Sequence, residues 1–224
     1  SFDIFRGIVG LDSTGNGDDG RAARECRFEV LESPLPRDST EIVLPSSAPR
    51  GDYRNKAPWI DYVVETLPVL VKENRGRTLV LFASYEDLEA VAANTASPIS
   101  TAGPPVLVQK KGQPTTDLCD EFRSLKESVL FGVDSFWYGI DFRGDTLTQV
   151  IITRVPYPSR RSPLQVLREI TMERSDYWRR YYYDTDIRMR QGMGRLIRGE
   201  KDRGRVVFID ARASRFLEGE GRGE

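Results

Sequence analysis

The chain has 224 residues, enough for one large domain or two small ones, and with 39% hydrophobic residues it can bury a substantial core. Its 33 basic and 34 acidic residues nearly cancel, so any contact with nucleic acid must come from a local patch. Histidine is absent, which removes the commonest general base and metal ligand, and the two distant cysteines, Cys26 and Cys119, cannot form a four-thiolate zinc site. No signal peptide or long apolar run is visible, so we expect a cytoplasmic protein that does not enter a membrane.

The first 50 residues differ in composition from the rest. Residues 12–20 are rich in Gly, Asp and Ser and predict a mobile loop, while 28–31 and 41–44 predict short strands. Residues 15–20 also satisfy the G-x-G-x-x-G pattern of a phosphate-binding loop. Two aspartates inside this stretch would repel phosphate, and Arg21 and Ala22 stand where a P-loop needs Lys and then Ser or Thr. We therefore interpret it as a flexible loop.

The remainder alternates between two kinds of pattern. Continuous apolar runs predict buried strands at 78–83, 106–109, 128–131, 149–153 and 205–209. Helical spacing falls between them at 57–74, where Pro68 suggests a kink or a break, and at 85–94, 117–126 and 164–183. This order implies right-handed βαβ units around a parallel sheet that is covered on both faces. Asp210, at the end of the last run, reads as a cap or turn residue rather than a metal ligand, because no acceptable phosphate loop precedes it.

A basic stripe before the last strand carries the strongest functional signal. At roughly 100° per residue, one side of a short helix ending at Gly199 would present four polar residues: Arg188, Gln191, Arg195 and Arg198. Gly192 and Gly194 flank the stripe, although glycine costs up to ~1 kcal/mol inside a helix. Planar, always-charged guanidinium groups at this spacing suit a polyphosphate, and a solvated helix face is the alternative. Since no phosphate loop is present, the stripe fits a domain that completes a site built mainly on another domain.

Three blocks in a fixed order then carry a resemblance. Residues 76–85, 129–142 and 191–198 are similar to motifs IV, V and VI of superfamily 2 helicases, and the spacer 155–158 also fits. Over residues 57–212 the chain resembles the second RecA-like motor domain of a DNA helicase of the DinG/XPD-like type. The resemblance implies a three-layer α/β/α domain with a mainly parallel sheet at 57–215. Residues 1–56 would be a lead-in segment of the same domain, and 216–224 a disordered tail.

The resemblance also implies a shared nucleotide site. ATP and Mg²⁺ would lie between this domain and a missing first motor domain that carries the Walker motifs, and this chain alone would bind no metal. Arg195 and Arg198 would be arginine fingers, and Gln191 would sense the γ-phosphate. Gly139 and Asp141 of motif V would lie at the cleft.

Single-stranded DNA would be the second ligand. The residues that the resemblance or the strand ends make candidates for it are Ser84, Tyr85, Lys110, Lys111, Ser135, Trp137, Arg160 and Arg161. For the basic residues a solvated turn is the alternative, and for Trp137 it is packing in the core. The aromatic residues at 177–183 mark either a nucleic-acid surface or a packed helix face. Motif V also departs from its relatives at Tyr138, where they usually carry Glu.

These features together predict the second motor domain of an ATP-dependent DNA helicase, inactive as an isolated fragment, with the first motor domain and single-stranded DNA as partners. A non-enzymatic module that binds single-stranded nucleic acid would share the basic loops and aromatics, but it leaves the glycine-flanked stripe unexplained. A stand-alone Rossmann-type enzyme would need a credible phosphate loop, and the acidic stretch at 15–20 is its only candidate.

Overall fold

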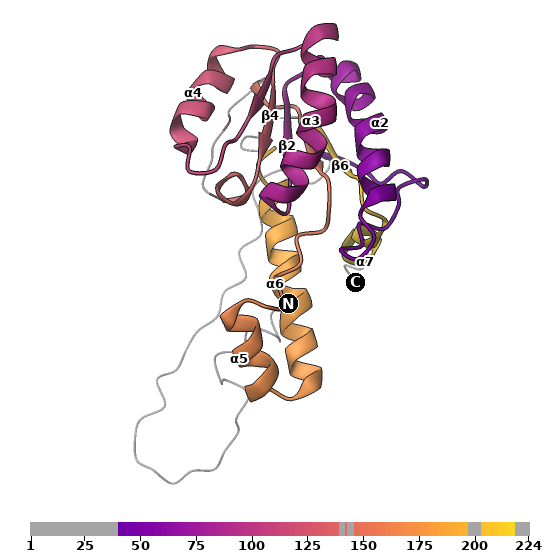
Figure 1. Ribbon diagram of the computed structural model, residues 1–224, viewed down its shortest axis with the longest axis vertical. Coiled ribbons are helices and arrows are strands. Elements are labelled where there is room, and N and C mark those ends of the chain that lie inside the picture. Colours follow the sequence, from indigo (N-terminus) through magenta and orange to yellow (C-terminus); the bar gives the residue numbers. More distant parts are fainter. Residues whose placement is uncertain (1–39, 139–141, 143–145, 197–202, 218–224) are drawn as a thin grey trace. The chain divides into compact units, whose positions relative to one another are not determined.

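The computed structural model describes residues 40–138, 142, 146–196 and 203–217. Within this part of the chain one parallel sheet has the strand order β1-β6-β5-β2-β4-β3. Figure 1 labels three of these strands, β2, β4 and β6. Its strands are β1 (Thr40–Val43), β2 (Thr78–Leu81), β3 (Val106–Val108), β4 (Val129–Gly132), β5 (Gln149–Ile152) and β6 (Gly204–Phe208). The predicted strands from 41–44 onward are therefore confirmed, and the run at 28–31 lies outside the described residues.

Helices cover both faces of the sheet. The α-helices are α2 (Ala57–Glu73), α3 (Tyr85–Ala102), α4 (Thr115–Ser124), α5 (Pro163–Thr171), α6 (Arg174–Met193) and α7 (Ser214–Leu217), with 3-10 turns η2 (Asp134–Trp137) and η4 (Ala211–Ala213). On one face α2 and α3 pack against each other and on Val80, Phe82 and Phe131. On the other face α4, α7 and the end of α6 cover Leu79, Leu81 and Leu130. The three-layer α/β/α prediction is confirmed.

The core follows from strict alternation along fully buried strands. Neighbouring residues of a strand point to opposite faces, so Val206 and Phe208 join one hydrophobic cluster while Val207 joins the other. All four residues of β2, β4 and β5 are buried. This burial on both faces explains why these strands read as continuous apolar runs in the sequence.

Helix α2 continues through Pro68 as a single helix, so the predicted break is absent. Proline in a helix interior costs about 3 kcal/mol, because it removes a hydrogen bond and crowds the preceding turn. The apolar stripe of Trp59, Val63, Leu67 and Val71 is almost fully buried on the sheet. Burying each such side chain contributes about 1.5–3 kcal/mol, which together outweighs the cost of the proline.

The predicted helix at 164–183 is two helices, and the second one is longer than expected. The backbone is extended at Met172 and Glu173, and α5 folds back beside the first half of α6 (Figure 1), where Arg168 pairs with Asp184 at 2.5 Å. Helix α6 then continues to Met193 and ends at the C-cap Gly194. The prediction of a separate short helix that ends at Gly199 is therefore wrong. Arg188 and Gln191 lie in the last turns of α6, and Arg195 follows the end of that helix.

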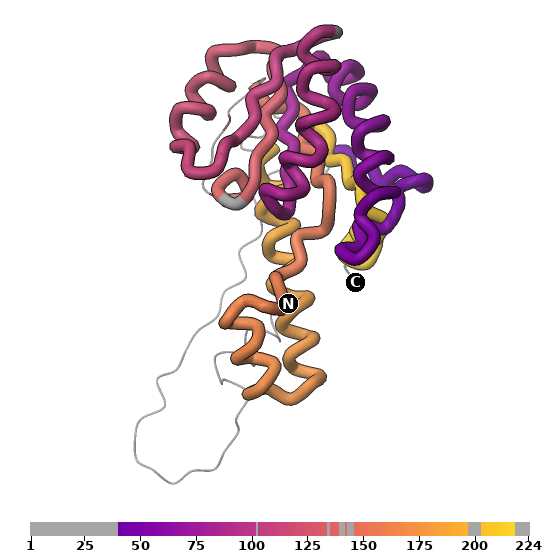
Figure 2. Tube along the Cα trace, in the orientation of Figure 1, coloured from indigo at the N-terminus to yellow at the C-terminus, as the bar shows by residue number. Residues whose placement is uncertain are grey.

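The lead-in segment and the end of the chain meet in the sheet. Strand β1 pairs in parallel with β6, and Figure 2 shows the indigo start of the described chain beside the yellow last strand. Helix α7 includes the first two residues of the predicted tail, and Phe216 is buried in the core. The loop predicted at 12–20 lies outside the described residues. None of the helices in the described ranges is both long and apolar enough to cross a bilayer.

Candidate functional site

Because all the strands are parallel, their carboxyl ends meet at one edge of the sheet, where ligands of α/β proteins bind. Ser135 lies at this edge, one turn after β4. Its hydroxyl is 2.9 Å from the Thr115 hydroxyl, and Gln109 donates to it through Nε2 at 3.4 Å. The side-chain oxygen Oε1 of Gln109 also accepts from the Val133 amide at 2.8 Å. These bonds hold the chain after β3, the start of α4 and the turn after β4 together.

Lys110 and Lys111 follow Gln109 directly and are both exposed, in a turn after β3. The predicted basic site at this strand end is therefore accessible to a ligand, and a solvated turn would have the same exposure.

Trp137 lies in the core rather than on the surface. Its side chain is 1% exposed, and its indole N–H donates to the carbonyl of Phe82 at 2.9 Å. Buried tryptophan rings normally satisfy their N–H in this way. In this conformation the ring offers no face to a base. Of the two alternatives for Trp137, contact with DNA or packing in the core, the structure shows packing in the core.

Ser84 caps helix α3, where its hydroxyl accepts from the Asp87 amide at 3.2 Å, and the partly exposed Tyr85 follows it. The Asp87 carboxylate beneath is fully buried and pairs with Arg154 at 2.5 Å and Lys56 at 3.0 Å. Burial acts to lower the pKa of Lys56, but its bonds to Glu86 and Asp87 outweigh this and raise the pKa above its usual value. A buried ion network therefore supports the motif IV turn.

Asp210 holds three segments together at the same edge. It is 1% exposed, and its carboxylate accepts from the amides of Gly51 at 3.1 Å, Val155 at 3.0 Å and Arg212 at 3.0 Å. The Arg212 guanidinium pairs with it at 2.7 Å. Burial acts to raise the pKa of Asp210, but Arg212 and the amides outweigh it and lower the pKa. The interpretation of Asp210 as a cap and turn residue is confirmed.

The end of α6 brings the motif VI residues against this edge. A Cβ atom at Gly192 would lie 2.9 Å from the Trp137 ring and 3.2 Å from Leu81, so only glycine allows α6 to approach so closely. Gln191 beside it is partly exposed, and its buried Oε1 has no hydrogen-bond partner among the described residues. Arg195, also partly exposed, donates from Nε to the Gln191 carbonyl at 3.0 Å. Close packing by glycine thus leaves the glutamine and the arginine together at the rim.

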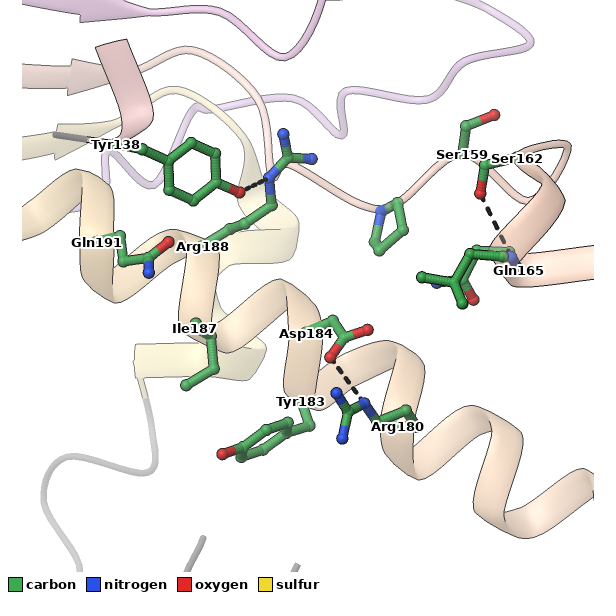
Figure 3. Close-up of a pocket in the computed structure, with 12 residues that line it drawn as sticks. Tyr138, Ser159, Ser162, Gln165, Arg180, Tyr183, Asp184, Ile187, Arg188 and Gln191 are labelled. Atoms are coloured by element: carbon green, nitrogen blue, oxygen red, sulfur yellow. Dashed lines mark hydrogen bonds and ion pairs between the residues drawn. The ribbon is translucent and has the colours of Figure 1, made fainter. Parts of the chain in front are cut away.

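A pocket of about 640 Å³ lies beside Gln191 (Figure 3). It is lined by Tyr138, Pro158, Ser159, Ser162, Leu164, Gln165, Arg180, Tyr183, Asp184, Ile187, Arg188 and Gln191. Arg188 donates from Nε to the Tyr138 hydroxyl at 2.7 Å, and its guanidinium carbon is 5.7 Å from the centre of that ring. This contact between motif V and α6 has no signal in the sequence, because fifty positions separate the two residues and no spacing pattern joins them.

Arg160 lies apart from these residues, near the start of α6. It pairs with Glu169 at 2.6 Å and packs over the Trp178 ring at 5.4 Å. The neighbouring Tyr181 is 8% exposed and donates to the Pro158 carbonyl at 3.0 Å, and burial raises its pKa to about 12. The aromatic face of α6 packs here against Tyr157 and Pro158 of the spacer. Of the two alternatives for residues 177–183, this contact agrees with the packed helix face.

Some predicted site residues cannot be placed. Gly139, Asp141 and Arg198 lie outside the described residues. Within the described ranges no group of three or more acidic or cysteine side chains could hold a metal ion.

The parallel three-layer fold, with a glutamine and an arginine at the rim of its carboxyl edge, defines a RecA-like motor domain. A profile of the helicase C-terminal domain family matches residues 67–217, and the chain therefore belongs to that family. Within it, the chain is a C-terminal motor domain of the DinG/XPD-like type, as the family profile and its DinG relatives indicate.

Two curated relatives illustrate the likeness. The chain is 28% identical over 187 residues to the "3'-5' exonuclease DinG" of Bacillus subtilis, covering 81% of this chain and 20% of the relative. It is 31% identical over 215 residues to the "ATP-dependent DNA helicase DinG" of Photobacterium profundum, covering 92% of this chain and 28% of the relative. The chain thus spans about a fifth to a quarter of the length of these proteins.

Solved structures agree on the fold. An XPD helicase superimposes with a TM-score of 0.65 at 20% identity, over 81% of this chain and 34% of the other. At this identity the likeness shows the architecture alone.

Proposed function

We propose that this chain is the second motor domain of an ATP-dependent DNA helicase that works on single-stranded DNA. Arg195 and Arg198 act as arginine fingers on ATP and Mg²⁺ held by the Walker motifs of a first motor domain, and Gln191 senses the γ-phosphate. Gly139 and Asp141 contribute to the cleft. Two relatives are named as DinG proteins, one of them an ATP-dependent DNA helicase.

The observation that carries the proposal is the junction of α6 with the sheet. Gly192 packs against Trp137 and Leu81, and this packing leaves Gln191 and Arg195 partly exposed at the rim. A guanidinium held to the protein backbone through Nε at the rim of the fold carries a fixed positive charge, which suits the charge that develops on a transferring phosphoryl group. The proposal assigns the nucleotide to a partner domain, and within the described residues no group of acidic or cysteine side chains could hold its metal ion.

The proposed contacts to single-stranded DNA come from exposed and partly exposed groups at the same edge. Lys110 and Lys111 are exposed after β3, and Ser84 and Tyr85 begin α3. Contacts of this kind neutralise phosphates and would give an affinity that falls with salt and does not depend on sequence. The buried Trp137 supports the turn and has no direct role in base stacking here.

Arginine-finger catalysis is tested by substitution in the full-length parent protein. We expect Arg195→Ala to lower the turnover of DNA-stimulated ATP hydrolysis about 10³- to 10⁵-fold, with little change in the affinity for single-stranded DNA. Arg179→Ala is the matched control, because Arg179 lies on the same helix and is 61% exposed, paired with Asp176. Hydrolysis that survives Arg195→Ala at the control's rate would refute the proposal.

A further inference from the structure

The pocket beside Gln191 carries an excess of positive charge. Its charged lining residues are Arg180, Arg188 and Asp184. The Asp184 carboxylate is already engaged, because Arg180 contacts it at 2.9 Å and Arg168 at 2.5 Å. With its one carboxylate neutralised in this way, the pocket is electrostatically suited to an anion.

Arg188 is held in a defined orientation by Tyr138. Its Nε donates to the phenol oxygen at 2.7 Å, and no described residue accepts a hydrogen bond from its terminal nitrogens. Figure 3 shows the two terminal nitrogens directed away from the tyrosine oxygen. A guanidinium fixed by a neutral partner keeps its full charge and presents a planar pair of donors, the geometry that oxyanions accept in a bidentate manner.

The wall formed by α5 supports the same kind of ligand. Ser162, the N-cap of this nine-residue helix, lines the pocket, so the partial positive charge of the helix start lies there. Gln165 also lines the pocket and is 2% exposed, yet its Oε1 has no hydrogen-bond partner among the described residues. Gln191 is partly exposed as a residue, but its Oε1 is buried and likewise has no hydrogen-bond partner among the described residues. Unpaired buried amides are costly, and either amide can offer its NH₂ group after a half-turn of its last bond.

We propose that this pocket is a phosphate-binding site, with Arg188 as the binding residue and Tyr138 as the residue that positions it. The phosphate belongs either to the backbone of single-stranded DNA or to the nucleotide of the neighbouring motif VI residues. The apolar wall of Leu164 and Ile187 and the ring of Tyr183 are placed to contact the sugar or base attached to it. The inference deepens the proposed function and rests on it for the identity of the phosphate.

The test uses Arg188→Ala, Tyr138→Phe and Arg195→Ala in the full-length parent protein, with Arg179→Ala as the control. One arm measures binding of a fluorescein-labelled oligothymidylate at a series of KCl concentrations without nucleotide. The other measures kcat and KM for ATP with saturating oligothymidylate. Far-ultraviolet circular dichroism and melting curves establish that each variant is folded. Arg188→Lys, which keeps the charge but loses the planar fork, serves as a second variant.

If the phosphate belongs to DNA, Arg188→Ala reduces the slope of log affinity against log salt by about 0.7, the contribution of one single-strand contact, and leaves KM for ATP unchanged. If it belongs to the nucleotide, KM for ATP rises about tenfold while the salt slope stays constant. Either result supports the proposal. In both cases we expect Tyr138→Phe to change the affected quantity, either the salt slope or KM for ATP, by less than Arg188→Ala does. We expect Arg188→Lys to keep the wild-type salt slope but to bind its phosphate ligand more weakly than wild type.

If Arg188→Ala has the same salt slope and the same KM for ATP as Arg179→Ala, the proposal of a phosphate site is overturned. A Tyr138→Phe protein identical to wild type would overturn the positioning role alone. The proposed function is tested separately, because it fails if Arg195→Ala retains ATP hydrolysis. In that case a reduced salt slope for Arg188→Ala would still support the phosphate site.

Discussion

Asp210 shows how much one buried carboxylate can stabilise this fold. It joins the lead-in segment at Gly51, the chain after β5 at Val155 and the turn at Arg212. Asp210→Asn replaces one accepting oxygen by a donor that faces other donors, and it leaves the partly buried Arg212 guanidinium, whose side chain is 20% exposed, without its counter-charge. We expect the free energy of unfolding at pH 7 to fall by about 3 kcal/mol, as when a buried ion pair is broken. Urea unfolding of both proteins measures this loss.

Asp120→Asn is the matched control for that substitution. Asp120 pairs with Arg123 at 2.7 Å, but its side chain is 74% exposed, so we expect a change of less than about 1 kcal/mol. Equal losses for the two variants would contradict the role given to Asp210.

The same carboxylate predicts how stability depends on pH. Because the pKa of Asp210 is lower in the folded state than its usual value, its contribution is fully present above the unfolded pKa of about 3.9. It is lost as the pH falls from there through the folded pKa. The difference in unfolding free energy between wild type and Asp210→Asn should therefore be constant from pH 5 to pH 7, and it should shrink below about pH 4. A difference that grows on acidification would contradict the lowered pKa.

At the residue scale, the sequence predicted the groups that act over short stretches and missed those that depend on tertiary contacts. Gln191 and Arg195 were singled out by an expected helical spacing and two nearby glycines, and the structure places both near the end of α6. The contact of Arg188 with Tyr138 joins residues fifty positions apart, so only the fold brings them together. The burial of Trp137 was left open for the same reason, since its environment depends on where α6 packs.

At the scale of one element, Gly192 tests how α6 sits on the sheet. Alanine is favoured over glycine in a helix by about 1 kcal/mol, but its Cβ would lie 2.9 Å from the rigid, buried ring of Trp137. Overpacking of a core costs about 1–3 kcal/mol, so we expect Gly192→Ala to destabilise the fold by about 1 kcal/mol net. Chemical denaturation of the purified chain, followed by tryptophan fluorescence, measures the change.

Gly194→Ala provides the comparison within the same motif. Gly194 is exposed, has a right-handed helical conformation, and a Cβ there would meet only the backbone carbonyls of Arg190 and Gln191, at 3.2 and 3.7 Å. We expect this variant to be as stable as wild type or slightly more stable. If Gly192→Ala behaves in the same way, α6 does not pack on Trp137 as described.

Strands were easier to predict than helices, because their signals differ in range. A strand buried on both faces shows a continuous apolar run of four or five residues. This signal is local, so it can be recognised without knowing how the rest of the chain packs. The limits of α2 and α6 depend on a balance between local cost and distant burial. Pro68 is tolerated because α2 has an apolar stripe on the sheet, and the break before Glu173 lets α5 return along α6. Neither balance can be computed from local propensity.

At the scale of the whole molecule, the proposed sharing of a nucleotide site between two domains makes a direct prediction. The family profile covers residues 67–217, and the relatives are about four to five times longer than the part that this chain matches. If Arg195 only completes a site whose phosphate loop lies on a first motor domain, the purified chain alone should hydrolyse ATP no faster than a buffer blank. The measurement is phosphate release with and without oligothymidylate, with the full-length parent protein as the positive control.

If the site is shared, adding a first motor domain should produce ATP hydrolysis in a way that depends on covalent linkage. A first motor domain added in trans at micromolar concentration binds as a separate molecule, whereas a covalent linker of suitable length raises the effective concentration to the order of millimolar. We therefore expect weak hydrolysis on mixing, increasing with the concentration of either partner, and much stronger hydrolysis from the linked protein. Arg195→Ala in this chain should remove both activities, because the guanidinium acts on the nucleotide bound by the other domain. Robust turnover by the isolated chain, or restored turnover that is indifferent to Arg195→Ala, would show that the site is not shared in this way.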